Sequence, residues 1–503
     1  MGKPNTVYSS TVEGPPSTEQ LNEQLNEQLN EQLNEQPEEQ TIEDEDLSIL
    51  TDSEAEVGEF VRKYGDINFK YIRKPKGSVW FIRPHALNFF KDGVLYRTKE
   101  ERTSGKTELF LDLMYVGIIA NLAGSACEEA TMGALLKYAL LFIPAWVVWS
   151  DIKDFTNYYY NEDLSQKLYI LWILVLLTLF ANSNGELLEG RKGAAFTIVP
   201  YILCRLSLAF SLLLYSCFIP QHRVQMRIYA VTILVTSSLW VPVIFVSTRS
   251  KIILAVVTIV LEQVCFCVCY HPATKKALKL RMSTALNIEH EVERFGVFVT
   301  IAVGEFLYKV VAEGPLGAGF SLKFVRGILL LLIAYDLFWI YQNGSTATKA
   351  THALRRNGWT AISWIYFHLP LVGGLVLAAD AGGDIASSDF ASISERLATS
   401  HEEQKKLFVL SLFFTGGLCV VLICIGVLAL LDLPHDPPKM HILPRFWRVI
   451  WRIPAGVLIL LLSFAHLDFT VLMGAVTGIL TALLIYESIV LTPRENLGYL
   501  CEN

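Results

Sequence analysis

Long apolar runs recur along the chain from residue 107 to residue 490. Each run is about 18–25 residues long, and an α-helix of that length crosses a hydrocarbon core of about 30 Å. The runs predict an all-α fold, a polytopic transmembrane helix bundle of about 12 helices. The expected helices cover residues 107–125, 133–152, 167–183, 195–217, 226–247, 251–270, 295–313, 323–343, 358–379, 407–431, 448–465 and 469–488.

Polar residues dominate the chain before the first of these helices. Residues 1–53 contain few aromatics and much Glu, Gln, Asn and Ser, including the strict repeat LNEQLNEQLNEQLNEQ, and this composition predicts a disordered low-complexity tail. Residues 54–106 mix aromatics with Lys and Arg, as expected of a cytosolic juxtamembrane segment beside anionic lipid. We expect the transmembrane domain to cover residues 107–490 and residues 491–503 to form a short cytosolic tail.

Basic residues are distributed unevenly among the connections between the apolar runs. Lys and Arg gather in residues 91–106, 275–294 and 349–356, whereas residues 126–132 and 466–468 contain none. Because cytosolic connections carry the excess of Lys and Arg, both termini are expected in the cytosol.

Composition also indicates a membrane protein. Of the 503 residues, 52% are hydrophobic and only 18% are charged, and the mean hydropathy is +0.39; a typical soluble protein has about 25% charged residues. The net charge of −7 arises largely in the N-terminal region, and no basic stripe indicates nucleic acid, so the expected partner is the lipid bilayer. The nine cysteines contain no C-x-x-C pair, and no Walker A, Rossmann or G-x-S-x-G motif occurs. We therefore expect no cofactor, no metal site and no enzymatic activity.

Several ionisable residues lie inside the expected helices, where hydrocarbon surrounds them. A central charge costs about 2.5–3.5 kcal/mol, so such groups must pair, lose their charge or line a hydrated cavity. With a rise of about 1.5 Å per residue, the deepest lie about 15 Å inside the membrane. They are Arg205, Glu262 and Glu305 near the midplane, Asp112 and Asp336 nearer the cytosol, and His368 near the middle of its helix. We expect Arg205 to face the bundle interior and to pair with Glu262 or Glu305.

Glu108 and Asp112 raise a separate question, because a spacing of four places both acids on one face of the first helix. A carboxylate at a helix N-terminus is stabilised by the helix dipole, so Glu108 can act as a cap. Asp112 lies beyond the first turn and has no cationic neighbour one turn away on its own helix. We expect Asp112 to open onto water, with Asp336 as its nearest acidic companion.

Three stretches resemble signatures of a known family. TELFLDLMYVGIIANLA resembles the E-L-F-F-D-L helix of the low temperature requirement A family, with Leu111 in place of the second Phe. LNIEHEVERFGVFVTIAVGE resembles its E-R-F-G-L-F…G-E signature, and THALRRNGWTAISWIYFHLPLVGGLVLAA resembles its later segment with H-L-P. The likeness covers roughly residues 81–490. It implies an integral membrane protein with many helices, and the family name records a growth phenotype rather than a mechanism.

The first two of these stretches also align with each other. Glu108 then meets Glu293 and Phe110 meets Phe295, each near the start of a six-helix half. This alignment is the basis of a further hypothesis, two parallel six-helix repeats of the kind found in transporters.

Two functions remain open from the sequence. One is a channel or transporter that moves protons, cations or a small solute through an acid-lined cavity, with Arg205 as the counter-charge. The residues of this pathway are Asp112, Glu305, Asp336, Arg205, Glu262 and His368. The alternative is a non-transporting membrane stress sensor or scaffold whose buried charges form a structural network. In either case Gly474-x-x-x-Gly478 is a helix-packing motif within one chain or between copies, so a homo-oligomer also remains open.

Overall fold

The computed structural model describes residues 49–50, 68–72, 79–98, 102–188, 190–313, 319–343, 352–389, 400–433 and 441–492. The chain divides into two units, Met1–Ser48 and Ile49–Asn503, and only the second contains described residues. The tail expected at 1–53, with its LNEQ repeat, therefore lies outside the described residues except for 49–50. The C-terminal tail expected at 491–503 likewise lies outside them except for 491 and 492.

Eleven segments of the described chain are helices long and apolar enough to cross a membrane. They are α3 (Lys106–Glu129), α4 (Met132–Tyr159), α5 (Leu164–Asn182), α6 (Arg191–Phe218), α7 (Arg223–Phe245), α8 (Thr248–Tyr270), α12 (Leu322–Gln342), α14 (Gly358–Ser387), α16 (His401–Leu431), the run α17 (Arg445–Val449), α18 (Arg452–Leu462) and η3 (Ser463–Ala465), and α19 (Phe469–Leu491). Each coincides with one of the helices expected from the apolar runs. The prediction of an all-α transmembrane bundle is thus confirmed.

The remaining expected helix, residues 295–313, is interrupted. It consists of α10 (Ile288–Val303), α11 (Glu305–Tyr308) and the π-turn η2 (Lys309–Glu313). At the break the Gly304 N–H lies 2.9 Å from the Ile301 carbonyl oxygen, so the turn is tighter than α-helical. A Cβ at this position would lie 2.8 Å from that same oxygen, and only glycine avoids the contact.

Four strands precede α3 along the chain and join a later strand in a five-stranded sheet, a feature that the expectation of a membrane-surface segment at 54–106 did not include. The sheet order is β1-β2-β4-β3-β5, with β2 and β4 parallel. The strands are β1 (Ile49–Leu50), β2 (Phe69–Ile72), β3 (Asn88–Lys91), β4 (Val94–Thr98) and β5 (Met282–Thr284). Asp92 and Gly93 join β3 to β4 with φ of 50° and 86°, the conformation that a tight hairpin turn requires.

Strand β5 belongs to the connection between α8 and α10, which also contains α9 (Pro272–Ala277). Its pairing with β3 ties the segment before α3 to this later connection. The Lys275 ammonium group donates a hydrogen bond to the Thr284 carbonyl oxygen at 2.9 Å and so supports the junction. The starts of α3 and α10 therefore lie at the same end of the bundle.

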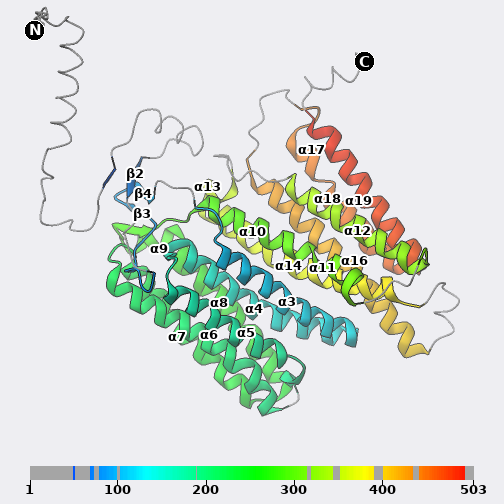
Figure 1. The fold of residues 1–503 in the computed structure, drawn as a ribbon, viewed down its shortest axis with the longest axis horizontal. Coiled ribbons are helices and arrows are strands. Elements are labelled where there is room, and N and C mark those ends of the chain that lie inside the picture. Colours follow the sequence, from blue (N-terminus) through cyan, green and yellow to red (C-terminus); the bar gives the residue numbers. More distant parts are fainter. Residues whose placement is uncertain are drawn as a thin grey trace, which may run out of the picture. The chain divides into compact units, whose positions relative to one another are not determined.

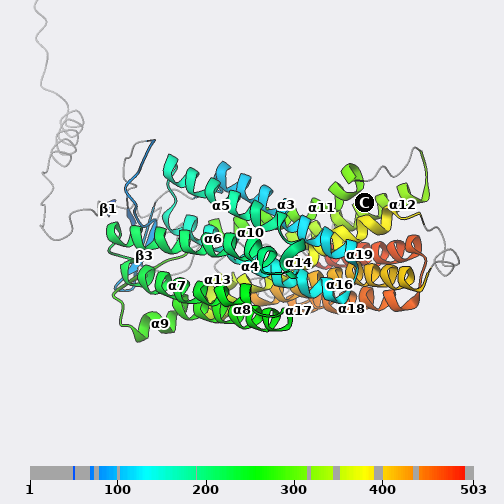
Figure 2. The ribbon, with the colours of Figure 1, turned by 90° about the horizontal axis from the view of Figure 1, so that it is seen from below.

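Helix α14 lies at the centre of the bundle and contacts α3, α10, α11, α12 and α16. Helices α5 to α8 lie on one side of α3 and α14, and α12, α18 and α19 lie on the other (Figures 1 and 2). Glycines allow α14 and α16 to approach closely: a Cβ at Gly417 would lie 2.5 Å from the Gly374 carbonyl oxygen. Such close backbone contact is the usual means by which membrane helices pack.

The proposed equivalence between α3 and α10 is not seen in the surroundings of the aligned residues. Glu108 is fully buried and Glu293 is half-buried. Phe110 is 53% exposed, whereas Phe295 is completely buried. The two-repeat arrangement therefore stays a hypothesis.

Candidate functional site

The side chains of α3 and α10 meet in a buried ionic cluster around Arg294. The Arg294 guanidinium group donates to Asp112 Oδ1 at 2.6 Å and lies 3.0 Å from Glu108 Oε1. Glu108 also accepts a hydrogen bond from Arg102 at 2.7 Å and lies 3.2 Å from His290 Nε2. The two acids share one face of α3 because that face is turned towards Arg294.

Glu108 acts as a helix cap as well as an ion-pair partner. Its Oε2 accepts a hydrogen bond from the Gly105 N–H at 2.8 Å, at the start of α3. The cap interpretation drawn from the sequence is therefore confirmed, and the ion pairs are additional to it.

Asp112 is closed off from water in this structure, contrary to expectation. Its side chain is completely buried, and Oδ1 accepts a second hydrogen bond from Trp149 Nε1 at 2.8 Å. Its other oxygen, Oδ2, has no hydrogen-bond partner among the described residues. The expectation failed because Arg294 was placed in a connection, whereas α10 begins at Ile288 and carries Arg294 into the bundle.

A second ion pair joins α4 to α10 beside this cluster. The buried Lys153 ammonium group contacts the Glu291 carboxylate and lies 2.8 Å from Asp154 Oδ1. Asn157 donates a hydrogen bond to Glu291 Oε2 at 3.3 Å and accepts one from the Asn287 N–H at 2.9 Å. These contacts fix the C-terminal end of α4 against the start of α10.

Two groups at the outer edge of the Arg294 cluster lie outside the membrane-spanning helices. The Arg102 guanidinium carbon lies 4.1 Å above the centre of the Tyr160 ring. Burial, reinforced by the nearby Glu108 carboxylate, raises the pKa of Tyr160 to about 12. Burial also lowers the pKa of Arg102 from its ordinary value, although the Glu108 carboxylate opposes this shift. At neutral pH Tyr160 therefore stays protonated. Arg102 lies between Tyr160 and Glu108, at the outer edge of the cluster.

Arg205 forms a separate cluster between α4, α6 and α8. It contacts the Asp151 carboxylate directly, and its Nε lies 3.8 Å from Glu262 Oε1. Glu262 also accepts hydrogen bonds from Tyr201 at 2.7 Å and from Trp240 at 3.2 Å. The expected partnership of Arg205 with Glu262 is present, but Asp151 is the nearer partner.

A small cavity of about 20 Å³ adjoins this cluster and is lined by Asp151, Arg205 and Glu262. It is large enough for a single water molecule, which needs about 10–15 Å³. Asp151 could have been singled out from the sequence because it lies inside the expected helix 133–152. However, it lies at the very end of that helix, beside polar residues, where a charged side chain is usual. Nothing in the sequence distinguishes a solvated helix end from a paired one.

His368 belongs to α14 and lies apart from both clusters, with its side chain against Tyr341 of α12. It is completely buried, its Nδ1 lies 2.8 Å from the Trp364 carbonyl oxygen, and its Nε2 lies 3.2 Å from the Tyr341 hydroxyl oxygen. A cavity of about 70 Å³ adjoins it and is also lined by His352, Asp432 and Arg452.

The remaining two predicted residues lie apart from these clusters. Asp336 accepts a hydrogen bond from Thr481 of α19 at 2.7 Å. Glu305 is half-buried and directly follows the break at Gly304. The expectation of one cavity lined by Asp112, Glu305 and Asp336 stays a prediction, because in this structure Asp112 is enclosed and Asp336 is bonded to α19. Arg205, the expected counter-charge of that cavity, belongs to another cluster.

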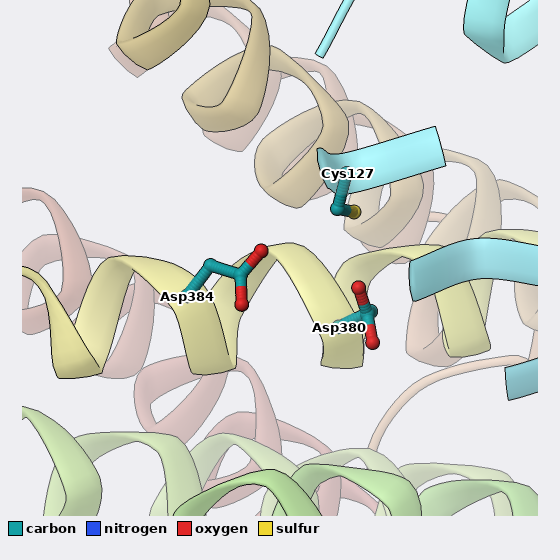
Figure 3. A group of neighbouring side chains, drawn as sticks. All are labelled: Cys127, Asp380 and Asp384. Carbon is teal, nitrogen blue, oxygen red and sulfur yellow. The ribbon is translucent and has the colours of Figure 1, made fainter. Parts of the chain in front are cut away.

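Another polar cluster, which sequence reasoning did not single out, lies further along α3, α10 and α14. The Lys309 ammonium group lies 2.6 Å from Asp380 Oδ1 of α14. Cys127 of α3 and Asp384 of α14 lie beside it (Figure 3). Lys309 lies within the expected helix 295–313, so its charge inside an apolar run could have marked it as a candidate site residue. Asp380 and Asp384 fell just beyond the expected helix 358–379, which extends to Ser387.

Large apolar side chains fill the space between the Arg294 cluster and Lys309. We call this contact between α3, α10–α11–η2 and α14 the seam. Tyr115 and Phe298 occupy it with ring centres 5.9 Å apart, and Phe298 stacks on Trp149 of α4 at 4.3 Å. All three side chains are essentially inaccessible. From Asp112 to Cys127 the seam runs about 22 Å, at about 1.5 Å per residue.

The fold and the buried ion pairs define an integral membrane protein that crosses the membrane many times. Residues 103–486 match the family described as Bacterial low temperature requirement A protein (LtrA). The chain therefore belongs to the LtrA family, as its three signature stretches indicated.

One curated relative is the uncharacterized protein RA0937 of Rhizobium meliloti (strain 1021). It is 22% identical over 323 residues, which cover 62% of this chain and 73% of the relative. No solved structure matches the chain with significance.

Proposed function

We propose that this protein moves protons or small cations across a membrane along the seam between α3, α10–α11–η2 and α14. The observation that carries the proposal is the distribution of charge along the seam. Buried ionisable groups gather at Arg294 near one end and at Lys309 near the other. Tightly packed, buried apolar and aromatic side chains lie between them, as expected of a pathway in its closed state. A larger solute is less well supported, because this core leaves little room.

The interrupted helix adds support. Transporters commonly carry their ion sites on discontinuous helices, and π-turns recur at functional positions. Here the break at Gly304 and the π-turn at Lys309–Glu313 enclose Glu305, and Lys309 begins the π-turn. An altered hydrogen-bond pattern at this depth allows a local rearrangement without unfolding the helix.

The proposal is tested with purified protein in sealed liposomes, using dyes that report protons, Na⁺ and K⁺. We expect flux in the parent protein and its loss in Asp112→Asn, which keeps the size of the side chain but removes its charge. Asp336→Asn is the matched control, because Asp336 is a buried acid outside the seam. Absence of flux in the parent, or an equal loss in both variants, would overturn the proposal.

A second candidate function is a non-transporting membrane stress sensor or scaffold. The observation in its favour is that buried charges pair throughout the bundle. Arg452, for example, donates to both carboxylate oxygens of Glu487 at 2.6 and 2.7 Å, far from the seam along the chain. Under this alternative Asp112→Asn lowers thermal stability, and no ion flux is measured in any variant.

The proposal includes an orientation with both ends of the chain in the cytosol. The sheet joins residues 88–98 to residues 282–284, so the two Lys- and Arg-rich segments lie at one end of the bundle. A cysteine at Arg281 should react with an impermeant reagent from the cytosolic face, and one at Met132 from the opposite face. The background would carry Cys217→Ser, since Cys217 is exposed. The reverse labelling pattern would invert the orientation.

A further inference from the structure

The polar cluster at the far end of the seam contains three potential metal ligands from two helices. Cys127 contributes a thiol from α3, and Asp380 and Asp384 contribute carboxylates one turn apart on α14 (Figure 3). The donor atoms of all three lie within 4.8 Å of one another. Cys127 and Asp380 are buried, whereas Asp384 is half-buried, so Asp384 is the most accessible of the three ligands.

A cationic group already occupies this cluster. The Lys309 Nζ lies 2.6 Å from Asp380 Oδ1, and the Lys309 side chain is only 12% exposed. Its stem passes over Gly383, where a Cβ would lie 2.5 Å from the Lys309 Cβ. On the other side, a Cβ at Gly124 of α3 would make ordinary van der Waals contact with Asp380 Oδ1 at 3.7 Å. The absence of a side chain at Gly383 thus makes room for the Lys309 stem, whose ammonium group reaches Asp380.

We propose that Cys127, Asp380 and Asp384 bind a divalent transition-metal cation of the zinc type, and that Lys309 occupies the site as a tethered cation when the metal is absent. A thiolate sulfur with carboxylate oxygens suits Zn²⁺, whereas Mg²⁺ and Ca²⁺ prefer oxygen ligands alone. Three protein ligands leave the fourth tetrahedral position to water, the arrangement of an open and exchangeable zinc site.

The charges of this site balance with a divalent ion. Metal binding forms one metal–sulfur bond and two metal–oxygen bonds, and it breaks the S–H bond of Cys127, whose proton passes to water. Two carboxylates and one thiolate carry a formal charge of minus three. The divalent ion cancels two of these charges, and the Lys309 ammonium group, displaced from Asp380 but still tethered nearby, cancels the third. Because a proton is released, the affinity for the metal rises with pH.

Binding requires a modest rearrangement. Metal–ligand bonds of about 2.0–2.3 Å at tetrahedral angles place ligand atoms about 3.5 Å apart, so the donors must close by about 1 Å. Lys309 must also leave Asp380, and as the first residue of the π-turn it lies where the helix is already irregular. The metal and Lys309 therefore compete for one carboxylate.

The test measures metal binding to the full-length protein in detergent, after treatment with a chelator. Zn²⁺ is titrated in competition with a chromophoric indicator, and Co²⁺ serves as a spectroscopic probe, since a cobalt–thiolate bond gives a charge-transfer absorption. We expect one saturable site per chain and a charge-transfer band that disappears in Cys127→Ser. Cys424→Ser is the control, because Cys424 is an equally buried cysteine on α16.

Two further variants separate a metal site from a structural ion pair. Asp384→Asn keeps the Lys309–Asp380 pair and should weaken Zn²⁺ binding about tenfold or more. Lys309→Met removes the competing cation and should tighten Zn²⁺ binding. Weaker or unchanged binding in a folded Lys309→Met protein overturns the competition, and no saturable binding in the parent overturns the site.

This inference does not depend on transport, because binding is measured without a membrane gradient. Proton flux in a protein that binds no metal would refute the metal site and leave the proposed function standing. Metal binding in a protein without flux would support the metal site and refute the proposed function.

Discussion

Arg294 holds two acids, and among the described residues it is the one cation that pairs with Asp112. It is completely buried and contacts both Glu108 and Asp112. Removing one partner from a buried ion pair leaves an uncompensated charge, which typically costs about 3–5 kcal/mol. We therefore expect Arg294→Leu to lower the free energy of unfolding by about this amount.

Thermal unfolding in detergent measures this effect. Arg281→Leu is the matched control, because the Arg281 side chain is 83% exposed and its pairing with Asp92 at 3.5 Å contributes little. A folded Arg294→Leu protein as stable as the parent would show that the acids are neutral or hydrated instead.

His222 lies at the end of the bundle that carries the sheet, and we predict that it makes the free energy of unfolding depend on pH. It lies between α6 and α7, outside both helices, and its Nδ1 lies 3.0 Å from the Tyr159 hydroxyl oxygen. Burial, with a smaller contribution from Lys275, lowers the pKa of His222 to about 3. The ordinary pKa is about 6.5, so between these values the unfolded chain binds a proton that the folded chain does not.

Stability should therefore fall as the pH falls from about 6.5 towards 3. The unfolding midpoint measured at a series of pH values should show this slope in the parent protein. His222→Gln keeps a polar partner for Tyr159 but cannot be protonated, so its slope should be smaller. An identical slope in both proteins would assign the pH dependence to other buried groups.

The helices themselves could be predicted from the sequence, but the ends of several could not. Apolar runs indicated where α4, α10 and α14 cross the membrane, because hydrocarbon selects for such runs. Their true ends extend further, to Tyr159, Ile288 and Ser387. The extensions carry charged residues, such as Arg294 and Asp380, whose partners lie on other helices. A charge at a helix end looks the same in sequence whether water or another helix receives it, so the clusters became visible only in the fold.

The sheet was missed for a different reason. Residues 54–106 are rich in basic and aromatic residues, which also suit a membrane surface. The Asp92-Gly93 turn between two apolar strands was the signal for a hairpin. Partners β2 and β5 lie far away along the chain, and no local pattern indicates that they join it.

Close approach of α14 to α16 gives a prediction at the level of helix packing. A Cβ at Gly417 would lie 2.5 Å from the Gly374 carbonyl oxygen and 2.9 Å from the Ala378 Cβ. Gly417→Ala must therefore separate the two helices, and overpacking of this kind typically costs about 1–3 kcal/mol.

Gly117→Ala on α3 is the matched control, because Gly117 is exposed and a Cβ there has no neighbour within 4 Å. It should be neutral or slightly stabilising, since alanine favours the helix. The midpoint of thermal unfolding is measured for both variants, and we expect a lower midpoint for Gly417→Ala. Equal midpoints would contradict the close packing of α14 on α16.

At the scale of the whole molecule, the part of the α19 surface around Gly474 and Gly478 meets no other helix of the described chain. A Cβ at Gly474 or at Gly478 would meet nothing within 4 Å, so this G-x-x-x-G motif does not serve contacts between the described helices. Gly478 is exposed and Gly474 half-buried, and Val471 beside them is 53% exposed. Membrane helices with such motifs associate because small residues let the two backbones approach closely. The sequence left a homo-oligomer open, and this face of α19 is where we expect a second copy of the chain to pack.

Gly474→Leu and Gly478→Leu fill this surface without touching the interior, so each variant should fold normally and lose the dimer. Light scattering in mild detergent measures the mass of the protein, and cross-linking in membranes confirms the state there. Gly117→Leu on α3 is the control, because a Cβ at Gly117 also meets nothing within 4 Å but no G-x-x-x-G motif surrounds it. If all three variants leave the mass unchanged at the value of a dimer, another surface forms the contact. If the parent is a monomer, the exposed glycines of α19 serve the lipid surface alone.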